Sequence, residues 1–502
     1  MTVPERIADF LDRHRVPLLV AWSICVAVPT MLRAAAKPFW HDEIYTVLLA
    51  RLPSISAHWA ALRDGVDFAP PLNGFATRAV RHLGGIGPLV ARIPPMIGFW
   101  TMAMAIFAIV RERGNATLAF AAISLTLFTA GYRYSYEARP YGLMMGLAAL
   151  AWFAWLRAAA GSRRGVYLTL LGVSLTAGLW NHYYAALTYA PIAVGEAVRT
   201  MRRRRVDAAV WAVVAGSIAA AAPLIPLVRL SATRTAHFWV APSFADIPAT
   251  YAFLFGGLAQ GFAWPLAGIA AITLWGRFRS PARSGNRPGI PAHEIAALVA
   301  ALLIPALGVL LALVATGAFV ARYALTAVFA VAVGVPLVIG RLERRARVAE
   351  LALLLVFAFA FVQSVPPFSP VPAFSDPVAA RPLLANALRE PGPTVISGEL
   401  MFLQLWYYSP VALRPQLVYL ADPQRALRYR ESDNVDLNYL ALARWTAVPV
   451  EPFDRFVRTH SAFRVYAAGS GWQLDGIRDM RMTVDLIGTD PGGRLFSVRQ
   501  QP

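Results

Sequence analysis

Long apolar stretches, separated by short charged segments, run through most of this chain. A transmembrane helix needs roughly 20 apolar residues to cross a hydrocarbon core of about 30 Å, or fewer when flanking groups snorkel. Eleven segments of suitable length are present, at residues 16–32, 93–110, 116–132, 141–156, 166–180, 183–198, 208–228, 247–275, 295–320, 323–339 and 351–365. The pattern predicts an α-helical polytopic membrane protein. The sixth segment is short and contains Pro191 and Glu196, so it alternatively forms a re-entrant pair with the fifth around Asn181-His182.

The arginines between these segments predict an orientation. With the amino terminus inside, the inner connections hold 21 Lys and Arg in 63 residues, whereas the outer ones hold 12 in 97. This asymmetry follows the positive-inside rule, and the four arginines at 202–205 are its clearest anchor. Because the number of predicted spans is odd, we expect the carboxyl end on the outer side.

The pattern changes after residue 365, where four closely spaced prolines predict a linker. Short strand-like runs at 394–397, 416–420, 463–466 and 494–498 alternate with helical stretches such as 381–389. We therefore expect two domains: a transmembrane domain at 1–365 with a large first outer loop at 33–92, and an exported soluble α/β domain at 366–502. The exported part contains no nucleophile motif, phosphate loop or metal cluster, which favours a structural or acceptor-docking role over a second active site.

Composition agrees with a membrane protein. It argues against a nucleic-acid-binding protein and against a protein built on disulfides or cysteine-based metal sites. The chain is 57% apolar and 15% charged, values that soluble globular proteins do not show. Its net charge of +19 comes from scattered arginines that membrane topology explains, so we expect no nucleic-acid partner. The single cysteine, Cys25, lies inside the first apolar segment, which excludes disulfides and cysteine-based metal sites.

Side chains suited to chemistry gather in the predicted outer segments. The first outer loop is about 60 residues long, and loops of that length are usually functional. It contains the acidic pair Asp42-Glu43 among aromatic residues, where a charge costs free energy unless something uses or neutralises it. The other candidates on this side are Pro70, Pro71, Glu137, Arg139, Tyr141, His182, Tyr183, Arg322 and Tyr323. Because all these residues are predicted to lie on the same side of the membrane, we expect them to form a single site.

Four motifs, taken in order, resemble the GT-C superfamily of glycosyltransferases, which includes the protein O-mannosyltransferases and the aminoarabinose and galacturonate transferases of bacterial lipid A. They are Asp42-Glu43, Pro70-Pro71-Leu72, Arg92-Ile93-Pro94 and Glu137-Ala138-Arg139-Pro140-Tyr141. The chain looks most similar to the bacterial branch that uses polyprenyl-phosphate sugars, with motifs over residues 22–189. That branch commonly has a histidine before the proline pair, where this chain has Ala69.

The resemblance implies a polyprenyl-phosphate sugar donor and a lipid, glycan or protein acceptor. It places the reaction at the periplasmic face of a bacterial inner membrane, with a cytoplasmic amino terminus, and implies direct, inverting displacement at the anomeric carbon. Such a reaction needs a base for the acceptor hydroxyl, and Asp42 is our candidate. Glu43 either orients a loop or an arginine beside it, or only favours the start of a helix through the helix dipole.

The leaving phosphate calls for a fixed guanidinium. Arg139 is the first candidate and Arg322 the second, although each could instead anchor a helix end at the membrane interface. His182 and Tyr183 either contact sugar or phosphate or belong to an ordinary interfacial aromatic belt. Glu137 pairs with Arg139 or helps to hold a metal.

A metal site is the less favoured alternative. If an ion is bound, hard oxygen ligands at Asp42 and Glu137 would favour Mg²⁺ or Mn²⁺. With no third acid at ligand spacing, we expect none.

Three other protein classes fit the sequence less well. A polytopic transporter would carry charges near the middle of its spans and often show internal repeats, neither of which is visible here. An enzyme similar to O-antigen ligases or polymerases, with diphosphate donors, would concentrate arginine and histidine in a large late loop. A structural or sensory membrane protein would leave the tyrosine-rich segment 132–141 unexplained.

Overall fold

The computed structural model describes residues 3–161, 163–234, 237–258, 289–340, 350, 352–358, 376–480 and 482–500. Contacts divide the chain into two compact units. The first consists of Met1–Ala34, Arg92–Ile225 and Pro242–Val371. The second consists of Ala35–Ala91, Pro226–Ala241 and Pro372–Pro502, so the first predicted outer loop packs with the C-terminal segment.

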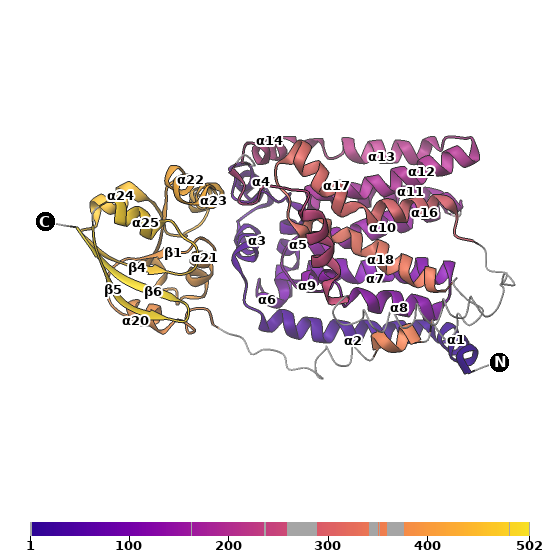
Figure 1. The fold of residues 1–502 in the computed structure, drawn as a ribbon, viewed down its shortest axis with the longest axis horizontal. Helices are drawn as coiled ribbons and strands as arrows, with labels where there is room; N and C mark the ends of the chain where they lie inside the picture. Colours follow the sequence, from indigo (N-terminus) through magenta and orange to yellow (C-terminus); the bar gives the residue numbers. More distant parts are fainter. Residues whose placement is uncertain are drawn as a thin grey trace. The chain divides into compact units, whose positions relative to one another are not determined.

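The first unit is a bundle of helices (Figure 1). Its elements are α1 (Val3–Arg13), α2 (Arg15–Ala36), α7 (Ile93–Arg113), α8 (Ala116–Thr126), α9 (Ala130–Ser135), α10 (Tyr141–Ala160), α11 (Arg164–Asn181), η2 (Tyr183–Thr188), α12 (Tyr189–Arg203), α13 (Ala208–Ala219), η3 (Ala222–Leu224), α16 (Ala292–Leu302), α17 (Ile304–Leu311), η5 (Ala312–Thr316), η6 (Ala321–Ala327) and α18 (Val328–Ile339). The predicted sixth span appears as η2 followed by α12.

Several of these helices are long and apolar enough to cross a membrane. Among the described residues five pass that test, and six do if α16 and the helix from Ile304 to Thr316, bent by 53°, form one span. The fold is therefore that of a polytopic helical membrane protein, as predicted. The expected total of eleven spans stays a prediction, because parts of the segments at 247–275 and 351–365 lie outside the described residues.

Glycines bring α7 and α10 unusually close together. A Cβ atom on Gly142 would lie 2.3 Å from the Pro95 carbonyl oxygen, and one on Gly146 would lie 2.3 Å from that of Gly98. Small residues four apart let helix backbones approach in membranes, where van der Waals packing drives association. This seam begins one residue after Tyr141, so it fixes the place where the segment 132–141 enters α10.

Glu196 pairs with other polar side chains inside the first unit. The Glu196 carboxylate accepts hydrogen bonds from Trp155 Nε1 at 2.9 Å and from Arg199 Nη1 at 2.8 Å. Arg199 Nη1 also lies 2.9 Å from Asp207 Oδ2. Pairing offsets the cost of removing these charges from water, and it explains how Glu196 is accommodated in the predicted sixth span.

The second unit joins the helices of the first outer loop to an α/β domain. The helices are α3 (His41–Arg51), α4 (Ile55–Arg63), α5 (Leu72–Val80), η1 (Arg81–Leu83), α6 (Pro88–Ala91), α14 (Ile225–Arg234), α20 (Pro382–Ala387), α21 (Glu399–Tyr408), η7 (Arg414–Gln416), α22 (Pro423–Arg430), α23 (Asn434–Ala443), α24 (Phe453–Thr459) and α25 (Gln473–Asp479). The strands are β1 (Thr394–Ser397), β2 (Leu417–Ala421), β3 (Val450–Pro452), β4 (Ala462–Ala467), β5 (Thr483–Asp490) and β6 (Gly493–Arg499).

The six strands form one mixed sheet in the order β3-β2-β1-β4-β6-β5. Strands β1 to β4 are parallel, whereas β6 pairs antiparallel with both β4 and β5. Helices α21, α22, α24 and α25 connect the strands, and an apolar core of Val395, Leu420, Val465, Phe453 and Trp472, among others, fills the domain. The expected small α/β domain is thus confirmed.

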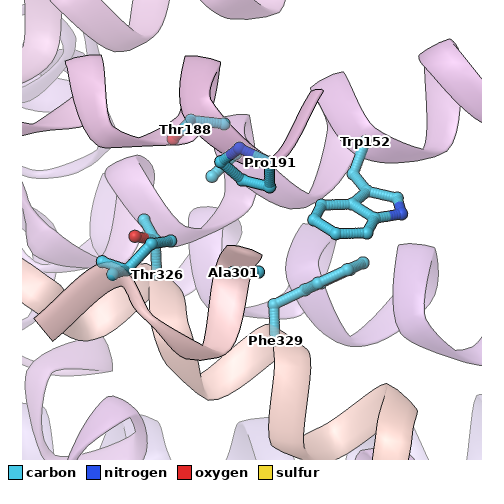
Figure 2. Close-up of a pocket in the computed structure, with 8 residues that line it drawn as sticks. Trp152, Thr188, Pro191, Ala301, Thr326 and Phe329 are labelled. Carbon is cyan, nitrogen blue, oxygen red and sulfur yellow. The ribbon is translucent and has the colours of Figure 1, made fainter. Parts of the chain in front are cut away.

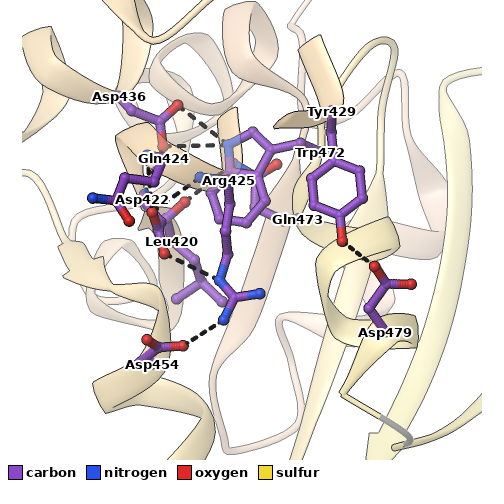
Figure 3. A network of polar contacts seen from close by, with 10 residues as sticks. All are labelled: Leu420, Asp422, Gln424, Arg425, Tyr429, Asp436, Asp454, Trp472, Gln473 and Asp479. Carbon is purple, nitrogen blue, oxygen red and sulfur yellow. Dashed lines mark hydrogen bonds and ion pairs between the residues drawn. The ribbon is translucent and has the colours of Figure 1, made fainter. Parts of the chain in front are cut away.

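A polar network at the carboxyl ends of the central strands holds this domain together (Figure 3). Asp436 on α23 accepts hydrogen bonds from the Asp422 backbone N–H at 2.8 Å and from Tyr419 Oη at 3.0 Å. Trp472 Nε1 donates to both of its oxygens at 3.2 Å. The network ties α23 to the end of β2 and to the start of α25.

Candidate functional site

The acidic pair opens helix α3. Trp40 is its N-cap, with extended dihedral angles, and Asp42 and Glu43 fall in the first turn, where the helix dipole favours acids. Every residue from His41 to Ala50 is buried except Asp42, whose side chain keeps 21% of its surface exposed. The two acids therefore lie in different environments.

Glu43 has the geometry of a helix-capping residue. It is fully buried, and its Oε2 accepts a hydrogen bond from the Trp40 backbone N–H at 3.3 Å. The Oδ1 atom of Asp42 instead lies 3.1 Å from the Nδ1 atom of His41. A carboxylate beside an imidazole and open to solvent can accept a proton from an incoming hydroxyl, so the base role fits Asp42 better than Glu43.

The other candidates of the first outer loop, Pro70 and Pro71, lie just before helix α5. Pro70 and Pro71 are buried, and Pro71 is the N-cap of α5. His58 on α4 packs edge-on against Phe75, with ring centroids 5.1 Å apart. Burial, partly offset by nearby Asp67, lowers the pKa of His58 to about 4. The histidine is therefore neutral at physiological pH and acts here as packing.

In the first unit, the predicted cations and aromatic residues come together from three separate segments. They come from the turn before α10, from the end of α11 and from the start of η6. Arg322 Nε donates to Tyr141 Oη at 2.7 Å, and its guanidinium carbon lies 5.8 Å from the centroid of the same ring. The His182 ring lies 5.5 Å from that of Tyr141 and 4.9 Å from that of Tyr323. We call Tyr141, His182, Arg322 and Tyr323 the arginine-aromatic cluster.

Arg139 and Glu137 border this cluster. Both are nearly buried, at 9% and 4% exposed, and the Arg139 backbone N–H donates to the Glu137 carbonyl at 2.7 Å. The next residue is fixed as well, because Asn181 Nδ2 donates to the Pro140 carbonyl at 2.8 Å. Tyr183 begins η2 and is half-buried.

The pKa of His182 reflects the positive charge around the arginine-aromatic cluster. Burial, followed by the nearby charges of Arg139 and Arg322, lowers its pKa to about 3. The ring is therefore neutral, and its Nδ1 accepts the backbone N–H of Tyr184 at 3.1 Å, which leaves the proton on Nε2. Two guanidinium groups that both act on one buried imidazole create a positive environment suited to an anion.

A cavity elsewhere in the bundle is lined mainly by apolar groups (Figure 2). Its lining residues are Ala148, Trp152, Thr188, Pro191, Ala301, Ile304, Thr326 and Phe329. None of them is charged, so this cavity lacks the groups that a phosphate requires. The arginine-aromatic cluster is the better candidate for binding an anion.

Metal ligands do not gather within the described parts of the chain. No group of three or more His, Cys, Asp or Glu side chains there could hold an ion. Asp42 belongs to the second unit and Glu137 to the first. Metal dependence therefore stays a prediction.

Two buried polar residues were not assigned roles by the sequence analysis. His41 contacts Asp42 and packs edge-on against Tyr439, with ring centroids 5.8 Å apart; its position next to the acidic pair was the available signal. Arg92 is completely buried, and its Nη1 donates to the Ala34 carbonyl at 2.6 Å. The motif Arg92-Ile93-Pro94 at the entry to a predicted span pointed to this residue, although not to a role for it.

Comparison with solved structures shows the fold. The structure is similar to that of ArnT from Cupriavidus metallidurans bound to undecaprenyl phosphate, with a TM-score of 0.57 and 13% sequence identity over 96% of this chain and 97% of that one. It is also similar to apo ArnT from the same organism, with a TM-score of 0.51 and 14% identity over 97% and 98%.

Comparison of the sequence with family models finds a match to part of the chain. Residues 69–228 match the family model of dolichyl-phosphate-mannose-protein mannosyltransferases. A search of curated proteins finds no match. The family match over this part of the chain and the ArnT-like fold both agree with the GT-C glycosyltransferase class that the four motifs predicted.

Proposed function

We propose that the protein transfers a sugar from a polyprenyl-phosphate donor to a lipid, glycan or protein acceptor on the outer face of a bacterial inner membrane. The observation that carries this proposal is the convergence of Arg139 and Arg322 on the neutral His182, beside two tyrosine rings. The solved ArnT structure that shares the fold is bound to undecaprenyl phosphate, a ligand with the same chemistry.

Arg139 and Arg322 are assigned to the donor phosphate. When the bond from the anomeric carbon to the phosphate oxygen breaks, the lipid phosphate leaves with an additional negative charge. Guanidinium groups held in place before the reaction stabilise that charge without reorganising. Arg322 is held by Tyr141, because its Nε donates to the phenol oxygen. Glu137, Tyr183 and Tyr323 border the same residues and are assigned to donor positioning.

Asp42 is assigned to the acceptor. Its carboxylate takes the proton of the acceptor hydroxyl while the acceptor oxygen forms its bond to the anomeric carbon and the bond to phosphate breaks. Attack from the face opposite the phosphate inverts the anomeric configuration. Glu43 supports this role indirectly, since it caps the helix that carries Asp42.

The donor class can be tested directly. Purified protein in proteoliposomes is given radiolabelled sugar on either a polyprenyl monophosphate or a polyprenyl diphosphate, together with envelope extract, and the labelled product is analysed by mass spectrometry. We expect transfer from the monophosphate only. Use of the diphosphate alone, or transport of label without any new product, would contradict the proposal.

The arginine assignment has a matched control in the same segment. Arg139→Ala should raise the KM for the donor about tenfold or more, as expected from the loss of a charge-assisted contact. Arg133 is exposed and six residues earlier, so Arg133→Ala should leave the KM unchanged. Equal effects of the two substitutions would show that general surface charge, rather than Arg139, attracts the donor. Chelation with EDTA in the same assay tests metal dependence, and we expect full activity.

A further inference from the structure

The C-terminal domain contacts the chain immediately before the acidic pair. The Phe39 backbone N–H donates to Tyr408 Oη at 2.6 Å, and Gln404 Nε2 donates to the Phe39 carbonyl at 2.8 Å. Both side chains belong to α21, which follows the first strand of the α/β domain. We call this pair of contacts the α21 clamp. It holds both polar backbone atoms of a residue about 365 positions earlier in the sequence.

The clamp is continuous with the start of α3. The next backbone N–H, that of Trp40, is held by Glu43 Oε2, so three successive backbone polar atoms are fixed by side chains. Phe39 itself is fully buried, and its ring packs edge-on against Tyr407 with centroids 5.9 Å apart. A backbone fixed in this way determines the direction in which the first turn of α3 presents Asp42.

The same domain holds α3 at further points. Arg51, the last residue of α3, donates from Nη2 to Tyr407 Oη at 2.9 Å, and its guanidinium lies 5.4 Å from the centroid of that ring. On α23, the ring of Tyr439 stacks on Tyr45 at 6.1 Å and meets His41 edge-on. Rotation or sliding of α3 would break contacts with two helices of the C-terminal domain.

We propose that the C-terminal domain is a positioning element for the reaction, and that Gln404 and Tyr408 are positioning residues that act through Phe39 on Asp42. This inference rests on the proposed function of Asp42 as the base. The physical reason is that a base contributes fully only when it is held within hydrogen-bond reach of the proton that it removes. The domain thus has a task in catalysis although it contains no catalytic motif.

The test removes the clamp and leaves Asp42 unchanged. Gln404→Leu and Tyr408→Phe are introduced together into the full chain, and Tyr408→Phe is also made alone in case the double variant does not fold. Tyr466→Phe is the control, because it removes a buried phenol of the same domain that donates to Asp490 at 2.7 Å, away from α3. Each protein is assayed for kcat and for the KM of the donor, normalised to folded protein.

We expect the clamp variants to lower kcat about tenfold with an unchanged KM, as displacement of a catalytic group by a fraction of an ångström would. The control should keep the wild-type kcat. A purely structural role would lower the yield of folded protein but not kcat per folded molecule. Wild-type kcat in folded clamp variants would overturn the proposal.

Hydrogen exchange separates this proposal from the assignment of Asp42. Backbone amides in a peptide covering residues 38–51 should exchange faster in the clamp variants than in wild type or in Tyr466→Phe. Unchanged exchange would overturn the clamp even if Asp42 proved essential. Faster exchange together with a fully active Asp42→Asn variant would instead retain the clamp and refute the function proposed for Asp42.

Discussion

Asp436 makes the stability of the C-terminal domain depend on pH. Its side chain is buried with 1% of its surface exposed, and burial raises its pKa from 3.8 to about 7, although hydrogen bonds from Asp422, Trp472 and Tyr419 oppose the shift. Between these two values the folded domain keeps the carboxyl protonated, whereas the unfolded chain ionises it. Unfolding therefore releases a proton, and the free energy of unfolding falls as the pH rises.

The size of this effect follows from the two pKa values. A change from 3.8 to about 7 corresponds to roughly 4 kcal/mol between the protonation states. The penalty is absent below pH 3.8 and complete above pH 7, so it grows by about 3 kcal/mol between pH 5 and pH 8. Asp436→Asn removes the ionisation. It loses some stability at every pH, because the NH₂ group of the amide cannot accept the hydrogen bonds that the second oxygen of the carboxyl group accepts.

Hydrogen exchange of C-terminal peptides in the reconstituted full chain measures this difference, after correction for intrinsic exchange at each pH. Wild type should lose about 3 kcal/mol more opening free energy than Asp436→Asn between pH 5 and pH 8. Asp454→Asn is the matched control: its carboxylate pairs with Arg425 but is 48% exposed, and it should behave as wild type. An equal pH dependence in wild type and Asp436→Asn would refute the reasoning.

Three further predictions concern the first unit. Gly142→Ala should lower the thermal stability by several degrees, because its Cβ would lie 2.3 Å from a backbone oxygen; Gly165→Ala, which meets nothing within 4 Å, should not. Arg322→Lys should raise the KM for the donor about tenfold, since it loses the Nε contact with Tyr141. A wild-type KM would contradict a role for that contact in donor binding. With a pKa of about 3, His182 is neutral throughout pH 5–9, so His182→Gln should alter the rate without changing the shape of the pH profile; loss of a limb would contradict this.

Hydropathy and strand patterns predicted the architecture, because positions that are buried in a helix or strand require apolar residues at a regular spacing along the sequence. The run at 394–397 became β1, and the runs at 463–466 and 494–498 lie within β4 and β6. Strands β3 and β5 were missed. The first has three residues, and the second is an edge strand with a bulge near Gly488 and an exposed surface, so neither shows clear alternation.

The site was only partly predictable, because contacts between distant segments leave no local signal. Topology alone put Arg139, His182 and Arg322 on one side of the membrane, and the structure brings these residues together. The different burial of Asp42 and Glu43 follows from how α3 packs. Phe39 is held by Gln404, and no local pattern marks that pairing.

The role of Asp42 as the base is tested most directly by the transfer rate of Asp42→Asn with a polyprenyl-monophosphate sugar in proteoliposomes. Loss of a general base should lower the rate about 10² to 10⁴-fold while the protein remains folded. Asp64→Asn, which alters another acid of the same unit that accepts a hydrogen bond from Trp445 at 2.9 Å, should retain most of the activity. Full transfer by folded Asp42→Asn would contradict the central claim.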